Sequence, residues 1–234
     1  APFDISRGWA YVLGADALGR PLLARIVVAA QNTIMVAAGA VAGSAVIGCG
    51  LGLIAGYSRK RAAQWIMRLG DVVMSFPSLL LAVIVLYMLE PSVANIVLVL
   101  AITRIPVYLR TTRAEVLEFR ERMFVQAARV MGASDRRIVF RHILPVVLPT
   151  LTTLATLDFA YVMLAESALS FLGLGGGRPE TAEWGRMLTY AQAELGINPW
   201  LAFLPGLCIA ITALGFTLLG ESLREALDPT SRRR

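Results

Sequence analysis

The strongest constraint in this sequence is a long stretch without charge. From residue 26 to residue 57 there is no Asp, Glu, Lys or Arg. About 20 predominantly apolar residues suffice for a helix to cross the hydrocarbon core of a bilayer. The whole chain agrees, because only 16% of its residues are charged, against roughly 25% in soluble domains. The sequence therefore predicts an integral membrane protein.

Four further apolar stretches follow the first. Two of them share residues 72–109 and are separated at residues 90–92, where Glu-Pro-Ser predicts a turn. The others cover about residues 144–169 and 200–220. These five stretches predict an all-α fold, a polytopic bundle of transmembrane helices.

Glycines in the first stretch indicate how that helix packs. Small residues four positions apart lie on one face of a helix and allow another backbone to approach closely. The glycines with this spacing are Gly39 and Gly43, and then Gly48, Gly52 and Gly56.

The basic residues predict the orientation in the membrane. Segments 58–70, 104–144 and 221–234 hold most of the 22 Lys and Arg residues and are expected to be cytoplasmic. We therefore expect residues 1–25 to form an extracytoplasmic segment and residues 26–234 a transmembrane domain. Five spans leave the termini on opposite sides, so a sixth span upstream is expected in the natural chain. Basic residues in blocks between apolar runs argue against nucleic-acid binding.

Segment 110–145 is the most informative cytoplasmic part. Apolar residues every three or four positions predict one helix with a single apolar stripe, made of Val116, Phe119, Met123, Ala127 and Val130. Gly132 is expected to end this helix, and Ser134 or Asp135 to cap a short second one. Pro145 would mark the return to the membrane. Such a segment could dock rigidly on a soluble motor subunit or rest on anionic headgroups, and its residues alone leave both open.

The same segment resembles the "EAA" loop of ABC importer permeases. The resemblance rests on Gln126-Ala127-Ala128, Gly132 and Ile143-Leu144-Pro145, with Gln126 where the family usually has Glu. Residues 133–135 and 141–145 resemble more closely the dipeptide and oligopeptide branch. Other stretches similar to that branch are residues 14–20, 71 with 75–81, 166–175, 184–185, 199–200 and 223–229, whereas 176–183 departs from its usual proline-rich pattern.

This resemblance implies a type I ABC importer permease fold in a bacterial inner membrane. It also implies partners: a paralogous permease subunit, two ATP-binding cassette subunits and an extracytoplasmic solute-binding protein. The residues expected to couple to the ATPase are Gln126, Ala127, Ala128, Gly132, Ala133, Ser134, Asp135 and Arg136. The sequence lacks the G-x-x-x-x-G-K-[ST] phosphate loop, so no cofactor is expected in this chain, and ATP and Mg are expected on partner subunits. Relatives of this branch handle dipeptides, oligopeptides, peptide-like antibiotics and metal complexes.

A few other residues suggest roles. Asp158 in the fourth stretch could line the translocation path or be a buried acid that is neutral or bonded to another helix. Arg104 is expected to extend toward the inner interface, and Trp184 and Gly185 could contact the binding protein. A membrane-embedded enzyme using Asp158 and Glu166 is an alternative, but eight helical residues separate them by about 12 Å along the axis. An ATP-independent channel is the other alternative.

Overall fold

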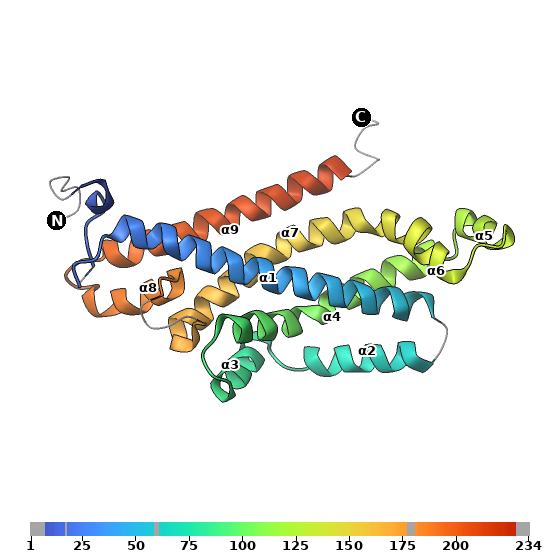
Figure 1. Cartoon of the computed structure of the whole chain (residues 1–234), viewed down its shortest axis with the longest axis horizontal. Helices are drawn as coiled ribbons and strands as arrows, with labels where there is room; N and C mark the ends of the chain where they lie inside the picture. The colour runs from blue at the N-terminus through green and yellow to red at the C-terminus, as the bar shows by residue number, and fades with distance from the viewer. Residues whose placement is uncertain (1–7, 17, 59–60, 177–180, 228–234) are drawn as a thin grey trace. The chain divides into compact units, whose positions relative to one another are not determined.

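The structure is a computed structural model that describes residues 8–16, 18–58, 61–176 and 181–227. Over these residues the chain is helical and has no β-strand, which confirms the predicted fold class (Figure 1). Parts of the predicted N-terminal segment (1–7), of segment 176–183 (177–180) and of the C-terminal match (228–229) lie outside the described residues. The α-helices are α1 (Leu22–Tyr57), α2 (Arg61–Met74), α3 (Ser78–Met88), α4 (Val93–Phe119), α5 (Met123–Val130), α6 (Asp135–Ile138), α7 (Leu144–Leu169), α8 (Trp184–Ala191) and α9 (Trp200–Leu227).

Shorter helical turns join some of these helices. Within the described part of the chain, 3-10 helices cover Trp9–Tyr11 and Gln192–Glu194, and π-helical turns cover Val139–Ile143 and Ser170–Leu174. The first π-helical turn joins α6 to α7 without a break, so the short helix α6 continues directly into a long apolar helix.

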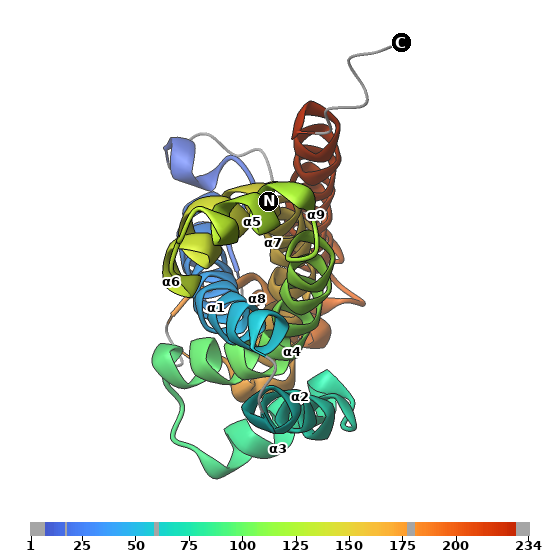
Figure 2. The same cartoon turned by 90° about the vertical axis from the view of Figure 1, so that its right-hand side faces the viewer.

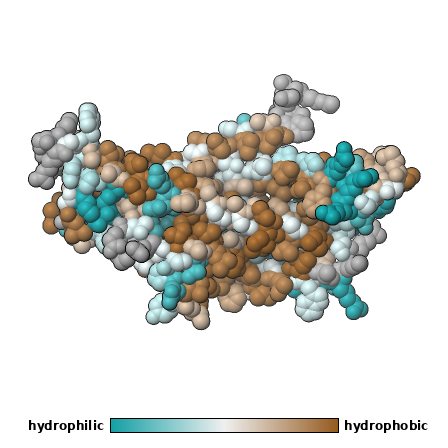
Figure 3. Space-filling model, viewed as in Figure 1, coloured by the Kyte–Doolittle hydropathy of each residue, from teal (hydrophilic) through white to brown (hydrophobic). Residues whose placement is uncertain are grey.

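Among the described residues, four helices are long and apolar enough to cross a membrane by themselves. They are α1, α4, α9 and the continuous helix Asp135–Leu174, and α2 and α3 together form a fifth span if this bent pair is counted as one. The predicted number of five spans agrees with this count only when the bent pair is taken as one span, and the count is four otherwise. In Figure 3 apolar side chains cover much of the helices, while hydrophilic side chains gather toward helix ends. Apolar surface of this kind is expected of helices that face lipid or other subunits.

The second predicted span is not a straight helix. The sequence predicted a span that begins near residue 72, whereas α2 and α3 meet near there at an angle of 86°. Residues 75–77 (Ser-Phe-Pro) interrupt the helix. Pro77 explains the interruption, because its ring disfavours the α conformation of the preceding residue. The turn predicted at residues 90–92 is confirmed, since it lies between α3 and α4.

The chain packs as two compact units, each assembled from three segments. Unit 1 contains Ala1–Gly39, Ala82–Leu100 and Phe159–Gly215, and unit 2 contains Ala40–Leu81, Ala101–Asp158 and Phe216–Arg234. Unit 1 therefore includes α8 and the part of α3 from Ala82 onward, and unit 2 includes α2, the start of α3 (Ser78–Leu81), α5 and α6.

Close packing through glycine is confirmed within unit 2. A Cβ atom built on Gly48, Gly52 or Gly56 of α1 would lie 2.5–2.7 Å from the nearest side-chain atom of α4. The α4 residues that it would meet are Tyr108, Thr112 and Val116, which are also four residues apart. The two helices thus approach so closely that no side chain fits between them along this line.

Candidate functional site

The loop predicted to couple to a motor subunit lies in unit 2 and forms two short helices. Gly132 follows α5 with φ of 82°, a conformation that favours glycine. The backbone N–H groups of Gly132 and Ala133 donate to the carbonyl oxygens of Arg129 and Ala128, each at 3.0 Å. This pair of bonds is the Schellman arrangement that ends a helix. The prediction that Gly132 ends the first helix is confirmed.

Ser134 begins the second short helix. Its hydroxyl group accepts a hydrogen bond from the backbone N–H of Arg137 at 3.4 Å, and its own backbone is extended. Both features are typical of an N-cap. Of the two capping residues predicted, Ser134 is the cap, and Asp135 is the first residue of α6.

A hydrophobic core fixes α5 and α6 to three spans. Figure 2 shows these two helices beside the adjacent ends of α1, α4 and α7. The buried side chains of this core are Leu53, Val116, Val125, Ala128, Ile138, Ile143, Val147 and Leu151. Because all five helices contribute to one core, α5 and α6 cannot be displaced without moving the adjoining ends of the spans or breaking the core.

Polar contacts join the same helices at the end of α1. The hydroxyl group of Tyr57, the last residue of α1, donates to the Asp135 carboxylate at 2.6 Å. The Arg129 guanidinium donates to the Tyr57 oxygen at 3.1 Å, and Arg120 donates to the carbonyl oxygen of Gly56 at 2.9 Å. The hydrogen bond with Tyr57 raises the pKa of Arg129 further, so this guanidinium stays charged. We call Tyr57, Arg129 and Asp135 the Tyr57 cluster.

The predicted apolar stripe is wrong beyond α4. Val116 is buried as expected, but α4 ends at Phe119 and a turn at residues 120–122 precedes α5. This turn changes the phase of the helical repeat, so that Val125 and Ala128 face the core. The side chains of Met123, Val130 and Met131 are instead exposed by 86%, 88% and 80%. An exposed apolar group of this kind marks a surface for contact with another protein or with lipid.

The structure brings the predicted coupling residues together on this helix–turn–helix. Ala128 is buried and Ala133 is half-buried, whereas the exposed members are Gln126, Ala127, Gly132, Ser134, Asp135 and Arg136. The Gln126 side-chain amide donates to the carbonyl oxygen of Glu121 at 3.0 Å, which ties the start of α5 to the turn before it. The segment thus combines an anchored inner side with an accessible outer side.

Asp158 is buried in unit 2 and forms an ion pair with Arg104 of α4. Its side chain is fully buried, and that of Arg104 is 17% exposed. Of the two interpretations of Asp158, this contact agrees with an acid bonded to another helix, and a role on the translocation path stays a prediction. The expectation that Arg104 extends toward the inner interface is not met, because its guanidinium turns to Asp158. Arg104 also lines a cavity of about 190 Å³.

A second group of charges is buried in unit 1. Glu183 accepts a hydrogen bond from the Ser170 hydroxyl group and pairs with Arg186, whose guanidinium nitrogen lies 3.3 Å from its carboxylate. Glu166 is fully buried nearby on α7, and Ser167 donates to it at 3.4 Å. These side chains connect the end of α7 and the turn after it to the start of α8.

The predicted contact of Trp184 and Gly185 with a binding protein is not supported. Trp184 is buried, and its indole N–H donates to the carbonyl oxygen of Ile26 at 3.2 Å. Gly185 is buried as well, and a Cβ atom there would collide with the backbone of Ser167. Both residues serve packing of α8 within unit 1, which leaves them no accessible surface for a second protein in this conformation.

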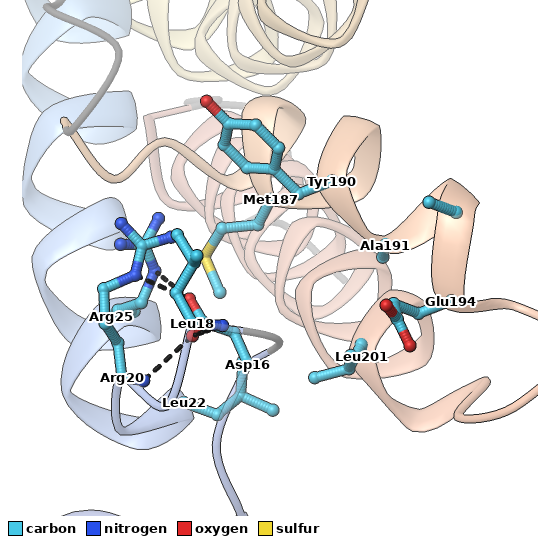
Figure 4. A pocket seen from close by; sticks show the side chains of 11 residues that line it. Asp16, Leu18, Arg20, Leu22, Arg25, Met187, Tyr190, Ala191, Glu194 and Leu201 are labelled. Atoms are coloured by element: carbon cyan, nitrogen blue, oxygen red, sulfur yellow. Dashed lines mark hydrogen bonds and ion pairs between the residues drawn. The ribbon is translucent and has the colours of Figure 1, made fainter.

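Unit 1 also contains a cavity of about 270 Å³. Figure 4 shows Arg20 and Arg25 converging on Asp16 at one side, with Glu194 on the other. Arg20 Nε lies 2.8 Å and Arg25 Nε 3.6 Å from Asp16 Oδ2. The wall between them is mainly apolar, with Leu22, Met187 and Leu201 among its residues. The two arginines thus share the Asp16 carboxylate, and Glu194 places a second carboxylate at the opposite wall of the cavity.

Sequence reasoning missed the Tyr57 cluster and the pairing of Arg104. Tyr57 could have been noticed as a polar aromatic residue at the end of a charge-free run. Arg104 is a single basic residue within an apolar stretch, and such a residue usually has an acidic partner in the bundle. Asp158 was the available partner, and matching the two would have found the pair.

The fold and the anchored loop define a class, the permease subunits of type I ABC importers. The chain superposes with a TM-score of 0.74 on a solved structure described as inward-facing conformations of the MetNI methionine ABC transporter, covering 89% of this chain and 98% of that one. Sequence identity is 18%, so this likeness concerns the fold alone. A second crystal form of that transporter gives a TM-score of 0.70.

Sequence comparison identifies the family. Residues 48–233 match the family described as binding-protein-dependent transport system inner membrane component, and the chain belongs to this family. It is 40% identical to the dipeptide transport system permease protein DppC of Alkalihalophilus pseudofirmus, covering 92% of this chain and 71% of the relative. It is 42% identical to the di/tripeptide transport system permease protein DppC of Pseudomonas aeruginosa (94% and 72%). It is 39% identical to the glutathione transport system permease protein GsiD of Pectobacterium atrosepticum (94% and 73%).

Proposed function

We propose that this chain is a permease subunit of an ATP-driven importer for peptides or peptide-like solutes. The names of its relatives support the solute class, since they refer to dipeptides, di/tripeptides and glutathione. These solutes share amide bonds and a carboxylate that is ionised at neutral pH. The chain itself would carry out no covalent chemistry, and would form the translocation path together with a paralogous permease.

The observation that carries the coupling proposal is the α5–α6 segment, anchored on one side and exposed on the other. In the proposed complex each of two ATPase subunits receives such a segment, with Met123, Val130 and Met131 entering an apolar groove of the ATPase. ATP and Mg bind to the ATPase subunits and not to this chain. A solute-binding protein delivers the solute on the opposite side of the membrane.

The core beneath α5 and α6 supports a transfer of movement. When the ATPase subunits close on ATP, they displace α5 and α6, and the shared core and the Tyr57 cluster carry this displacement to the ends of α1, α4 and α7. The energy comes from the different affinities of the closed and open ATPase for ATP. A flexible loop could not transmit the movement, because its own rearrangement would absorb it.

ATP hydrolysis by the reconstituted complex, with and without its binding protein, tests this proposal. Val130→Asp places a charge on the exposed surface and should abolish stimulation by the binding protein without unfolding the chain, because residue 130 is outside the core. Val130→Met is the matched control, since it keeps an apolar side chain at the same exposed position. Full stimulation in Val130→Asp, or uptake of solute without ATP, would contradict the proposal and favour the channel interpretation.

A second pair of variants tests the shape of the segment. Gly132→Val forces a β-branched residue to adopt a positive φ, which is strongly disfavoured, whereas Gly132→Asn can adopt it at lower cost. We expect loss of stimulated hydrolysis in the valine variant and its retention in the asparagine variant. Equal behaviour of the two would show that the Schellman turn is not needed for coupling.

A further inference from the structure

We propose that Arg104 binds the carboxylate group of the solute during transport, in a cavity of unit 2, and that Asp158 positions Arg104 for this contact. The inference rests on the proposed function, because it takes the solute to be a peptide with a free carboxylate. It assigns to Arg104, a residue of the transmembrane domain, a role in selecting solutes that have a free carboxylate.

The cavity has the size and lining for a small polar group. Its volume of about 190 Å³ accommodates a carboxylate group together with water molecules. Its polar lining residues are Ser78 of α3 and Thr103 and Arg104 of α4, and apolar side chains such as Phe76 and Leu81 complete the wall. An arginine and two hydroxyl-bearing residues at the wall of one cavity are suited to orient a carboxylate.

The depth of Asp158 indicates that this cavity is inside the membrane. Asp158 lies 14 residues after the first residue of α7, about 21 Å along the helix axis, and thus near the middle of a span. Its ion pair with Arg104 draws the guanidinium to this depth. An arginine there is tolerated where it faces protein or water and not lipid tails. The cavity beside it is therefore a place for water or solute.

The interrupted helix beside the cavity leads independently to the same conclusion. Residues 75–77 separate α2 from α3, and Phe76 lies in the wall of the cavity. Backbone that is not helical occurs at membrane depth where it is covered by protein or lines a water-filled space. An arginine and an interrupted helix are both unfavourable in contact with lipid, and both lie at this cavity. The face of the permease that contains the cavity is therefore the one that borders the translocation path.

Asp158 gives the contact a strength that suits transport. Because the Asp158 carboxylate already compensates the charge of Arg104, a second carboxylate is held less tightly than it would be by an isolated arginine. A solute site on a path must be occupied and then vacated, which requires such moderate binding. Asp158 also fixes the orientation of the guanidinium, so that the group is ready before the solute arrives.

Uptake by the reconstituted complex with its binding protein tests this proposal. The two probes are the dipeptide L-alanyl-L-alanine, which has a free carboxylate, and its C-terminal amide, which has none. We would compare the wild type with Arg104→Gln, Arg104→Lys and Asp158→Asn. Arg68→Gln is the matched control, because it removes the same charge from an exposed position on α2 that does not line the cavity. The binding protein is identical in all samples, so a change in the uptake ratio of the two probes reports on the permease.

Arg104→Gln should lower uptake of the free acid about tenfold and leave uptake of the amide nearly unchanged, while Arg68→Gln keeps the wild-type ratio. Asp158→Asn should keep the preference for the free acid and lower its KM, because the competing carboxylate is gone. Arg104→Lys retains the charge and should change the uptake ratio of the free acid to the amide by a smaller factor. It replaces Arg104→Gln in the experiment if the glutamine variant does not assemble.

If the Arg104 variants and Asp158→Asn all lose uptake of both probes to the same extent, the proposal is overturned. A purely structural ion pair between Arg104 and Asp158 would give that result. An unchanged ratio in both Arg104 variants would overturn it as well. In these two cases the wild type still imports the dipeptide, and the proposed function stands. Import of neither probe by the wild type would refute the peptide assignment and this inference together.

Discussion

Replacing Gly52 with alanine tests whether α1 and α4 pack through their backbones in unit 2. A Cβ atom at residue 52 would lie 2.5 Å from Cβ of Thr112 and 2.9 Å from the carbonyl oxygen of Leu109. Neither atom can rotate away, because one belongs to the α4 backbone and the other is bonded to it. The helices must separate, and overpacking of this kind costs about 1–3 kcal/mol. Alanine also favours the helix by about 0.8–1 kcal/mol relative to glycine, which offsets part of the loss.

Gly50→Ala is the matched control for this variant. Residue 50 lies in the same helix, and among the described residues no atom lies within 4 Å of a Cβ built there. Both variants gain the same helix propensity, and only Gly52→Ala introduces a steric overlap with α4. The free energies of unfolding of the two variants should therefore differ by about 1–3 kcal/mol.

The assay is the apparent melting temperature of the purified protein in detergent. For a chain of this size each kcal/mol corresponds to about 2–4 °C. We expect Gly52→Ala to melt below Gly50→Ala by about 2–12 °C, and Gly50→Ala to melt at or above the wild type. Equal melting temperatures for the two variants would refute the close approach of α1 and α4 at Gly52.

Three further predictions concern single contacts. Tyr57→Phe removes the hydroxyl group that joins Asp135 and Arg129, and should lower the amount of solute imported per ATP hydrolysed without changing the helical content seen by circular dichroism. An unchanged amount of solute per ATP would exclude a role of this hydroxyl group in coupling. Gly185→Ala drives a Cβ atom into the backbone of Ser167 and should abolish the monodisperse peak in size-exclusion chromatography, whereas Gly196→Ala, with no described atom within 4 Å of its Cβ, should keep it. Ser134→Ala removes the N-cap of α6 at about 1 kcal/mol, and should speed amide hydrogen exchange there; Ser134→Thr keeps the capping oxygen, and faster exchange in both variants would argue against capping.

Local signals in the sequence were sufficient for four of the spans and for the turn between the short helices, but not for the start and the bend of the second predicted span. A charge-free run identifies a membrane helix without knowledge of its neighbours. Gly132 and Ser134 act on the backbone within a few residues, through a positive φ and a capping hydroxyl group. The glycine spacing in α1 likewise indicated a close neighbour, although not that α4 would be that neighbour.

Features that depend on distant residues could not be predicted in the same way. Tyr57 and Asp135 are 78 residues apart in sequence, and no local pattern specifies which polar groups meet across such a distance. The apolar stripe failed for a different reason, because a short turn at residues 120–122 changes the phase of a periodic pattern that otherwise looks continuous. Trp184 was expected to contact a binding protein, but the carbonyl oxygen of Ile26 provides a buried partner for its N–H group.

The interruption between α2 and α3 has a mechanical consequence. In unit 2 the parts of α1 and α4 that meet at the glycines interlock backbone against backbone, and the core under α5 and α6 joins them to the start of α7. These elements are therefore expected to move together as a rigid body. Residues 75–77 are exposed and lie outside that core, so rotation of a few backbone dihedral angles there disturbs little packing. A force applied at α5 would thus bend the chain at residues 75–77, next to the cavity that Arg104 lines.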